Sequence, residues 1–355
     1  MPTSILHLPY NQGNFVSSLQ YAERELGATS MSAAPSNIFT EPPDLLLTED
    51  HWRSLKTIRT YFRARRMNIL VFNYGASLFN VPFRRWFLLD LPFYPENQKK
   101  IMFFQGSDAR IAYGEHIEES RHFEKSLGNV LAPATKDGFI TQEEISLKQE
   151  KADKIDRYID RIFYFNPDLS TGLPRRAKFI PYPFLPTSQS PILKIDRERP
   201  LRVLHLSTNR VLKGTGLIER ALEITKKDVN IESSVLVRAP RETAKKALDW
   251  ADVLIDQVGL GWYGMQAVEA LSQGKIVICL IDQSAWAKHL PKYVDTPSGI
   301  IHSNHRGIPS IIAKISGNKN LRHALSIAGP AFVRDVHDPA KILQRSYGDL
   351  IDGHG

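Results

Sequence analysis

Residues 251–280 constrain the fold of this chain more than any other segment. An apolar run at 253–255 is followed by a glycine-rich loop at 259–264 and by a helical pattern that stops at Gly274 before a second apolar run. A buried strand, a loop, a helix and another buried strand form the repeating unit of a parallel sheet covered by helices. In open α/β sheets, a loop in this position presents backbone amides to nucleotides.

The same alternation continues through most of the chain, and the proline-rich stretch 181–191 interrupts it. We therefore predict an α/β fold with two doubly wound, Rossmann-like domains, at 1–185 and 201–330, joined by a linker at 186–200. A cleft between two such domains would hold the ligand. The predicted strands lie at 5–9, 68–72, 101–105, 129–131, 161–165, 179–183, 201–206, 231–237, 253–255 and 276–281. The predicted helices lie at 14–26, 216–225, 241–250 and 264–273, with a helical tail at 318–351 that is broken at Gly329-Pro330.

The composition fits a globular protein of two domains. The chain has 355 residues, of which 42% are hydrophobic and 24% charged, enough for each domain to bury a core. No apolar run approaches the roughly 18 residues of a membrane span, and the first residues do not resemble a signal peptide. The one cysteine, Cys279, cannot form an internal disulfide. We expect a cytoplasmic protein.

The positive charge is concentrated in residues 53–110, which contain eleven basic and three acidic residues. Lys56, Arg59, Arg63 and Arg66 would form a stripe on one side of a helix, and 83–87 adds aromatic residues beside two arginines. Two interpretations stay open. The segment contacts an anionic membrane, on the inner face of the cytoplasmic membrane, or it is a solvated helix face beside ordinary core aromatics. We find no nucleic-acid-binding motif and expect no nucleic-acid partner.

Two segments of the second half carry residues suited to a nucleotide. Gly264 and Met265 begin the helix after the glycine-rich loop, where free amides can hold a diphosphate, and Glu269 lies in its second turn, within reach of a ribose. Lys213-Gly214 follows a predicted strand and precedes a helix, a suitable place for a cation facing phosphate.

Together these segments resemble the donor-sugar signature of retaining glycosyltransferases of family 4, which have the GT-B fold. In that family the region reads Glu-x-x-Gly-x-x-x-x-Glu, and the second glutamate, which grips the ribose, matches Glu269. The first glutamate falls on Gly261, so a usual contact to the donor hexose is missing.

The family also has an Arg…Lys-Gly pair that holds the diphosphate. Its Lys-Gly matches Lys213 and Gly214, the arginine position falls near Thr208, and Arg210 stands two residues later as a substitute.

Two fragments of the first half are similar to glycosyltransferases of bacterial surface-polysaccharide synthesis. The loop at 8–14, with Asn11 and Gly13, resembles the one after their first strand, where a glycine lets substrate approach the backbone. The run at 103–110 resembles a cleft element in which histidine stands at the position of Gln105. Gly106 and Asp108 match that element. A β-turn with Asp108 as its cap is the structural alternative, and we favour the functional interpretation of Asp108.

The resemblance implies a function. The enzyme would move a hexose from a nucleotide-diphosphate sugar to a hydroxyl of a glycan or lipid-linked acceptor, with retention, without metal and with no cofactor beyond the sugar nucleotide as co-substrate. Asp108, Lys213 and Glu269 would be catalytic. The first domain would bind the acceptor, the second the donor, and a C-terminal helix at 331–355 would return to the first domain.

Two other functions remain open. Gly261 and Gln105 are also compatible with a catalytically degenerate GT-B module that binds a nucleotide sugar or a partner without turnover. The glycines at 259, 261 and 264 match Gly-x-Gly-x-x-Gly, which would suit an NAD(P)-dependent oxidoreductase, although the acidic residue expected near the ribose is not in place.

Overall fold

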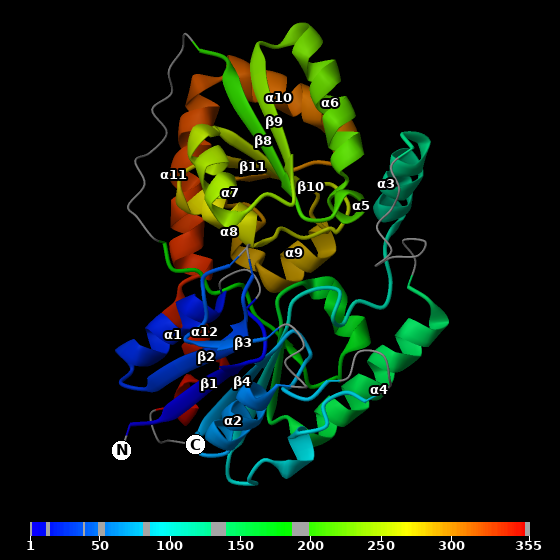
Figure 1. Cartoon of the computed structure of the whole chain (residues 1–355). Coiled ribbons are helices and arrows are strands. Elements are labelled where there is room, and N and C mark those ends of the chain that lie inside the picture. Colours follow the sequence, from blue (N-terminus) through cyan, green and yellow to red (C-terminus); the bar gives the residue numbers. More distant parts are fainter. Residues whose placement is uncertain are drawn as a thin grey trace. The chain divides into compact units, whose positions relative to one another are not determined.

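The structure is a computed structural model, and it describes residues 2–11, 15–37, 40–48, 54–80, 86–128, 140–186 and 199–351. The chain divides into two compact units, which Figure 1 shows together. The first unit consists of Met1–Ile111, Ile140–Leu185 and Asp338–Gly355, and the second of Ala112–Phe139 and Pro186–His337. Each unit is an α/β domain built on one parallel sheet, in agreement with the predicted fold class.

The first unit contains a seven-stranded sheet in the order β3-β2-β1-β4-β5-β6-β7, with every neighbouring pair parallel. The order reverses at β1, which has β2 on one side and β4 on the other. The strands are β1 (Ser4–Leu8), β2 (Thr29–Pro35), β3 (Leu45–Leu47), β4 (Ile69–Asn73), β5 (Lys99–Phe104), β6 (Arg161–Tyr164) and β7 (Lys178–Phe179).

The helices of the first unit include one from the end of the chain. Helix α12 packs against α1, and the buried Glu23 carboxylate of α1 accepts a hydrogen bond from the Tyr347 hydroxyl. Arg161 also donates to both carboxylate oxygens of Asp349 at 2.6 Å. The helices are α1 (Phe15–Glu25), α2 (Leu55–Ala64), α4 (Gln142–Tyr158) and α12 (Pro339–Ser346), with 3-10 turns at Leu91–Phe93, Pro167–Gly172 and Gly348–Leu350.

The second unit contains a five-stranded parallel sheet in the order β12-β11-β10-β8-β9. Its strands are β8 (Leu201–Ser207), β9 (Ile231–Val237), β10 (Val253–Gln257), β11 (Ile276–Cys279) and β12 (Ile300–His302). Its helices are α3 (Glu115–Ser126), α5 (Arg210–Lys213), α6 (Thr215–Asp228), α7 (Arg241–Trp250), α8 (Met265–Ser272), α9 (Gln283–His289), α10 (Ile308–Gly317) and α11 (Lys319–Val336), with 3-10 turns at Pro291–Tyr293 and His305–Gly307.

The core of the second unit explains why its strands could be predicted. All residues of β10 and β11 are buried, and these strands are continuous runs dominated by valine, isoleucine and leucine. Helices cover both faces of a parallel sheet, so its central strands must be apolar on both sides. In β10 the apolar run ends in Asp256 and Gln257, two buried polar residues at the carboxyl end of the sheet.

The structure contradicts two of the sequence predictions. Residues 112–128 belong to the second unit, although their position before β6 suggested the first domain. Helix α11 runs through Pro330 without a break and ends at Val336. A side chain at Gly329 would meet the Leu271 carbonyl oxygen at 2.9 Å, so this glycine serves close helix packing rather than helix termination. The predicted strand at 129–131 and most of the linker lie outside the described residues.

Candidate functional site

The strand order of the second unit places a candidate site at the carboxyl ends of β8 and β10. From β8 the chain moves first to β9 on one side and then to β10 on the other, so the order reverses between β8 and β10. Ligands of open α/β sheets bind at such reversal points. The two segments predicted to bind the donor follow these two strands, with Lys213 after β8 and Gly264 after β10.

The loop after β10 is held by one buried side chain. The Gln257 carboxamide oxygen accepts hydrogen bonds from the Gly259 and Leu260 amides, both at 2.7 Å, and its nitrogen donates to the Trp262 carbonyl at 2.7 Å. The backbone at Gly261 is left-handed, with φ of +73°, which favours glycine at this position. The loop is therefore a fixed turn that delivers Gly264 to the start of α8.

Lys213, Asp256 and Gly264 meet at the centre of the site. The Lys213 ammonium lies 2.5 Å from one oxygen of the fully buried Asp256 carboxylate, and the other oxygen accepts the Gly264 amide at 2.8 Å. A Cβ added to Gly264 would lie 3.6 Å from Lys213 Nζ. The fold therefore brings the Lys213 ammonium to the N-terminus of a helix, through a carboxylate that was not predicted.

Gly214 shapes the turn that positions Lys213. Its φ of +70° is left-handed, and a side chain there would approach Val258 Cγ2 to 2.4 Å. The Val258 amide donates to the Lys213 carbonyl at 3.1 Å, which ties the turn after β8 to the loop after β10. Only glycine satisfies both the backbone conformation and the close approach.

The side chain of His205 connects the same turn to the sheet. It is fully buried in β8, and Nδ1 lies 2.8 Å from the Ile255 carbonyl, which can only accept, so Nδ1 carries the proton. Nε2 then accepts from the Thr215 hydroxyl at 3.0 Å, at the first residue of α6. Burial lowers the pKa of His205 to about 4, which keeps the ring neutral.

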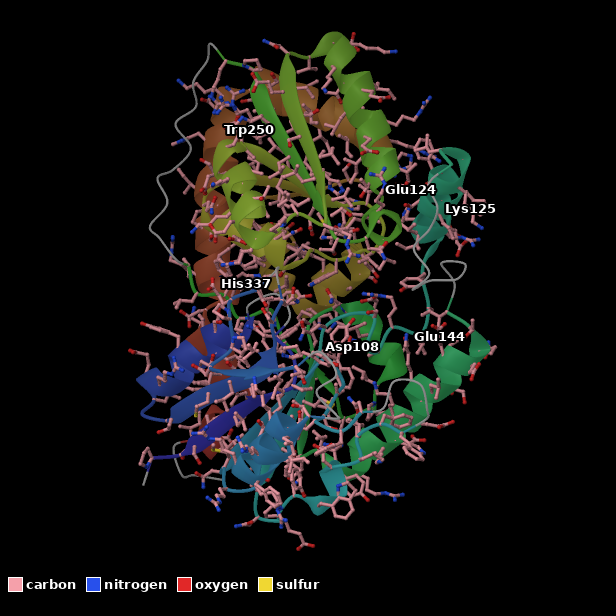
Figure 2. All side chains as sticks on the ribbon, viewed as in Figure 1. Asp108, Glu124, Lys125, Glu144, Trp250 and His337 are labelled. Atoms are coloured by element: carbon pink, nitrogen blue, oxygen red, sulfur yellow. The ribbon has the colours of Figure 1, made fainter. Side chains whose placement is uncertain are left out.

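Arg210 lies in an ion-pair cluster. Its guanidinium donates to Glu124 of α3 at 3.0 Å and to both carboxylate oxygens of Glu219, and these pairs raise its pKa. The second oxygen of Glu124, which is labelled in Figure 2, accepts the Gly216 amide in the first turn of α6 at 2.8 Å. The Glu124 carboxylate therefore binds two groups at once. One is the first turn of α6, and the other is Arg210, the cation that was predicted to help bind the donor.

Helix α8 presents the remaining predicted donor residues. Met265 is its first residue and Glu269 lies in its second turn, both half-buried. Gly264 precedes the helix as its N-cap, and its amide is the one bound to Asp256. Cys279, at the end of the next strand, is buried near Asp256, and burial raises the pKa of its thiol, so it is not an activated nucleophile.

Three of the predicted residues of the first unit, Gln105, Gly106 and Asp108, form a polar turn after β5. Asp108, labelled in Figure 2, accepts hydrogen bonds from the Gly106 amide at 2.6 Å and from the Gln105 amide at 3.1 Å. Burial raises the pKa of this carboxyl. Asn11 is buried and donates to the Glu41 carbonyl at 3.4 Å, whereas Gly13 lies outside the described residues. Asp108 therefore caps this turn.

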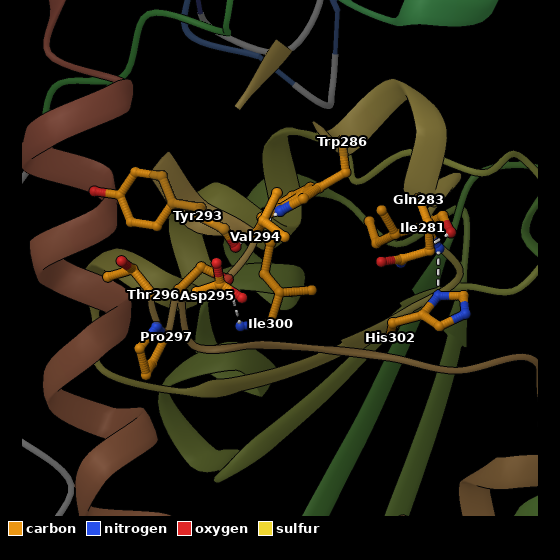
Figure 3. Close-up of a pocket in the computed structure, with 11 residues that line it drawn as sticks. Ile281, Gln283, Trp286, Tyr293, Val294, Asp295, Thr296, Pro297, Ile300 and His302 are labelled. Atoms are coloured by element: carbon orange, nitrogen blue, oxygen red, sulfur yellow. Dashed lines mark hydrogen bonds between the residues drawn. The ribbon is translucent and has the colours of Figure 1, made fainter. Parts of the chain in front are cut away.

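A pocket of about 320 Å³ adjoins the loop of the second unit (Figure 3). It lies beside α9 and β12 and is lined in part by Trp286, Tyr293 and His302. Its lining residues Ile281 and Gln283 flank Asp282, whose amide donates to the Gly261 carbonyl at 2.7 Å. None of the residues predicted to bind the donor lines this pocket.

Among the residues that the structure describes, no group of three or more histidine, cysteine, aspartate or glutamate side chains is arranged to hold a metal ion. The charged groups at the start of α8 are one lysine and one carboxylate, Lys213 and Asp256.

The fold resembles those of solved glycosyltransferases. Neither a scan of protein-family models nor a search of curated proteins found a match. Sucrose-phosphate synthase from Thermosynechococcus elongatus aligns over 99% of both chains, with a TM-score of 0.60 and 10% identity. An alpha-glucosyltransferase in complex with UDP and a 13-mer DNA aligns over 99% of both chains, with a TM-score of 0.58 and 10% identity.

A glycosyltransferase from Rickettsia africae aligns over 97% of this chain and 96% of its own, with a TM-score of 0.56 and 9% identity. These neighbours are GT-B glycosyltransferases, and the prediction of a GT-B fold is therefore confirmed. Identity of this size establishes the fold alone, and the activity has to be argued from the site.

Proposed function

We propose that the protein is a glycosyltransferase that uses a nucleotide-diphosphate sugar, bound where β8 and β10 end. One observation carries the proposal: the Lys213 ammonium lies beside the N-terminus of α8, at the reversal point of the sheet. An ammonium and free helix amides are the two groups that bind phosphate in such folds. A neighbour of the same fold was captured with UDP, which supports testing nucleoside diphosphates first.

Lys213 can bind phosphate while it stays paired with Asp256. An ammonium has three donors, and Asp256 takes one of them, so two remain for the diphosphate. Asp256 itself is buried below the site, where it fixes the ammonium and the Gly264 amide together. The Met265 amide and the positive end of the α8 dipole would then face the same phosphate, and Glu269 would accept hydrogen bonds from the ribose hydroxyls.

The reaction requires no nucleophile from the protein. In the proposed retaining step, the acceptor oxygen bonds to the anomeric carbon on the face from which the leaving phosphate oxygen departs, and that oxygen takes the acceptor proton. Lys213 and the α8 amides stabilise the charge that builds on the diphosphate. Because they supply positive charge without a metal, we propose a metal-independent transfer of a hexose to a hydroxyl of a glycan or lipid-linked acceptor.

A second candidate is a GT-B module that binds a sugar nucleotide without turnover. Gly261 offers no carboxylate to the donor hexose, and Arg210 is already neutralised by Glu124 and Glu219. This candidate shares the donor site with the first but has no transfer activity. A nicotinamide-dependent oxidoreductase remains a third, less supported function, because it rests only on the three glycines of the loop.

Thermal unfolding followed by a turnover assay separates the three. The melting temperature is measured with UDP, GDP, ADP, TDP and NAD(H), and the sugar nucleotide of the stabilising base is then tested for acceptor-dependent release of nucleoside diphosphate. Release that Lys213→Ala abolishes supports the transferase. Stabilisation without release supports the binding module, and stabilisation by NAD(H) alone overturns both.

A further inference from the structure

Helix α2 of the first unit exposes its large apolar side chains and buries smaller ones. It buries Thr57, Thr60 and Ala64, while Leu55 is 74% exposed, Ile58 is 43% exposed and Phe62 is 58% exposed. A surface helix of a globular domain normally turns its apolar stripe to the core. Here the large apolar side chains lie on the outward side, at positions i, i+3 and i+7 of one stripe.

The inward side of α2 makes its own contacts with the domain. Tyr61 packs against the rings of Phe79 and Tyr94, at 5.8 Å and 5.3 Å between centroids, and Ser54 caps the helix by accepting from the Lys56 amide. These contacts attach the helix to its domain through residues other than the outward apolar ones.

Phe93 extends the apolar stripe beyond the helix. It is 66% exposed, and its carbonyl accepts a hydrogen bond from the Tyr61 hydroxyl at 3.4 Å, which places it beside α2. We call Leu55, Ile58, Phe62 and Phe93 the α2 apolar face. Several large exposed apolar groups gathered in one place mark a surface that meets another apolar phase or partner.

Cations surround the α2 apolar face. Residues 54–67 contain no aspartate or glutamate, and their five basic side chains are all exposed. Helical geometry places Arg59 and Arg66 on one side of Leu55 and Phe62, and Arg65 on the other. The five basic residues are Lys56, Arg59, Arg63, Arg65 and Arg66.

We propose that the α2 apolar face docks this protein on an anionic lipid bilayer, with the helix lying in the plane of the interface. Apolar side chains would enter the headgroup region while the flanking cations meet lipid phosphates, which is the arrangement of interfacial helices. Among the described residues no helix is both long and apolar enough to cross a membrane.

The charges and the exposed apolar side chains argue against two other partners of this surface, a second copy of the chain and a nucleic acid. In a two-fold dimer the same patch faces itself, so five cations would be set against five cations. A nucleic acid would satisfy the cations, but it would leave the exposed leucine, isoleucine and phenylalanine side chains without an apolar partner. A bilayer with anionic headgroups offers phosphates to the cations and an apolar phase to the exposed apolar side chains. The inference goes beyond the proposed function and does not depend on it.

Vesicle binding tests the proposal without any enzymatic assay. The full-length protein is sedimented with vesicles of phosphatidylcholine and with vesicles of equal parts phosphatidylcholine and phosphatidylglycerol. We expect binding to the anionic vesicles only. Leu55→Ser/Phe62→Ser and Arg59→Glu/Arg63→Glu are each expected to weaken it at least about tenfold. Added salt should weaken the binding as well.

Helix α6 of the second unit offers matched controls, because Ile224 is an exposed apolar residue near the exposed Lys226 and Lys227. Ile224→Ser and Lys226→Glu/Lys227→Glu repeat the same kinds of change and should leave vesicle binding intact. Unchanged melting temperatures of the α2 variants show that the fold is kept.

Three results would overturn the proposal. The first is equal sedimentation with both kinds of vesicle or with neither. The second is equal loss in the α2 and α6 variants. The third is a concentration-dependent dimer in sedimentation equilibrium that Leu55→Ser/Phe62→Ser dissociates. Nucleoside-diphosphate binding, measured separately in solution, reports on the proposed transferase and is expected to be unchanged in every α2 variant.

Discussion

The Lys213 ammonium and the Asp256 carboxylate form an ion pair at 2.5 Å, and the carboxylate is fully buried. The pair joins the turn after β8 to the loop after β10, because Asp256 also accepts the Gly264 amide. It is the structural basis of the site, because it holds the Lys213 ammonium beside the start of α8. Its contribution can be measured apart from any activity.

Lys213→Met should destabilise the second unit by about 3 kcal/mol, because it leaves a buried carboxylate without its cation. The double variant Lys213→Met/Asp256→Asn should recover most of that loss, since an asparagine oxygen can still accept the Gly264 amide. Urea denaturation measures both. Lys292→Met is the control: its pair with Asp335 is exposed, and its removal should cost less than about 1 kcal/mol. Equal losses of stability in Lys213→Met and Lys292→Met would contradict the role given to the buried ion pair.

The two glycines of the loop should respond differently to alanine. Gly261 has φ of +73° and its nearest contact to an added Cβ is 3.6 Å, so Gly261→Ala should cost about 1–2 kcal/mol from backbone strain alone. Gly264 has φ of −103° and an added Cβ would also have 3.6 Å of room, so Gly264→Ala should change stability by less than about 0.5 kcal/mol. Urea unfolding of the two variants is the measurement. A loss at Gly264 as large as that at Gly261 would show that the loop geometry is different.

His205 should make stability depend on pH. Burial lowers its pKa from 6.5 to about 4, so between these values the unfolded state binds the proton that the folded state does not. Stability therefore falls as the pH is lowered from 6.5 towards 4, by up to about 3 kcal/mol from this residue. His205→Gln cannot titrate, and its unfolding free energy should have a shallower pH dependence over this window. Parallel curves for the variant and the wild type would refute the assignment.

Tyr347 should anchor the end of the chain to the first unit. Its hydroxyl donates to the buried Glu23 carboxylate, which also lies 3.1 Å from His7 Nε2. Tyr347→Phe removes one donor from a buried charged group and should destabilise the first unit by about 1–3 kcal/mol. Tyr21→Phe, on the exposed side of the same helix α1, is the matched control and should have no measurable effect. Hydrogen exchange in α12 would show whether the released segment is the one that opens.

Periodicity predicted the regular elements where burial is simple. β10 and β11 were found because a central parallel strand is apolar on both sides, and α7 was found at the bounds that the structure gives, Arg241–Trp250. β2 was missed because Thr29–Pro35 is made of small and polar residues that carry no alternating pattern. Pro330 misled the prediction because close packing at Gly329 outweighs the helix-breaking effect of proline.

The site was predictable in its local motifs but not in its long-range pairs. Lys213 and Gly264 could be chosen because each follows a strand, which places both at one edge of the sheet. Asp256 was hidden because an acidic residue at the end of an apolar run reads as the end of a strand. Glu124 was hidden because it pairs with Arg210 across 86 residues, and no local pattern reports such a contact.

Calorimetric titration with nucleoside diphosphates tests the central claim most directly. We predict that one nucleoside diphosphate binds the wild-type protein, and that Lys213→Ala and Glu269→Ala each weaken its affinity at least about tenfold, which corresponds to the loss of one hydrogen bond to a charged group. Glu223→Ala, an exposed glutamate of α6, should bind like the wild type. Unchanged affinity in both site variants, or no binding of any nucleoside diphosphate, would contradict a donor site at the ends of β8 and β10.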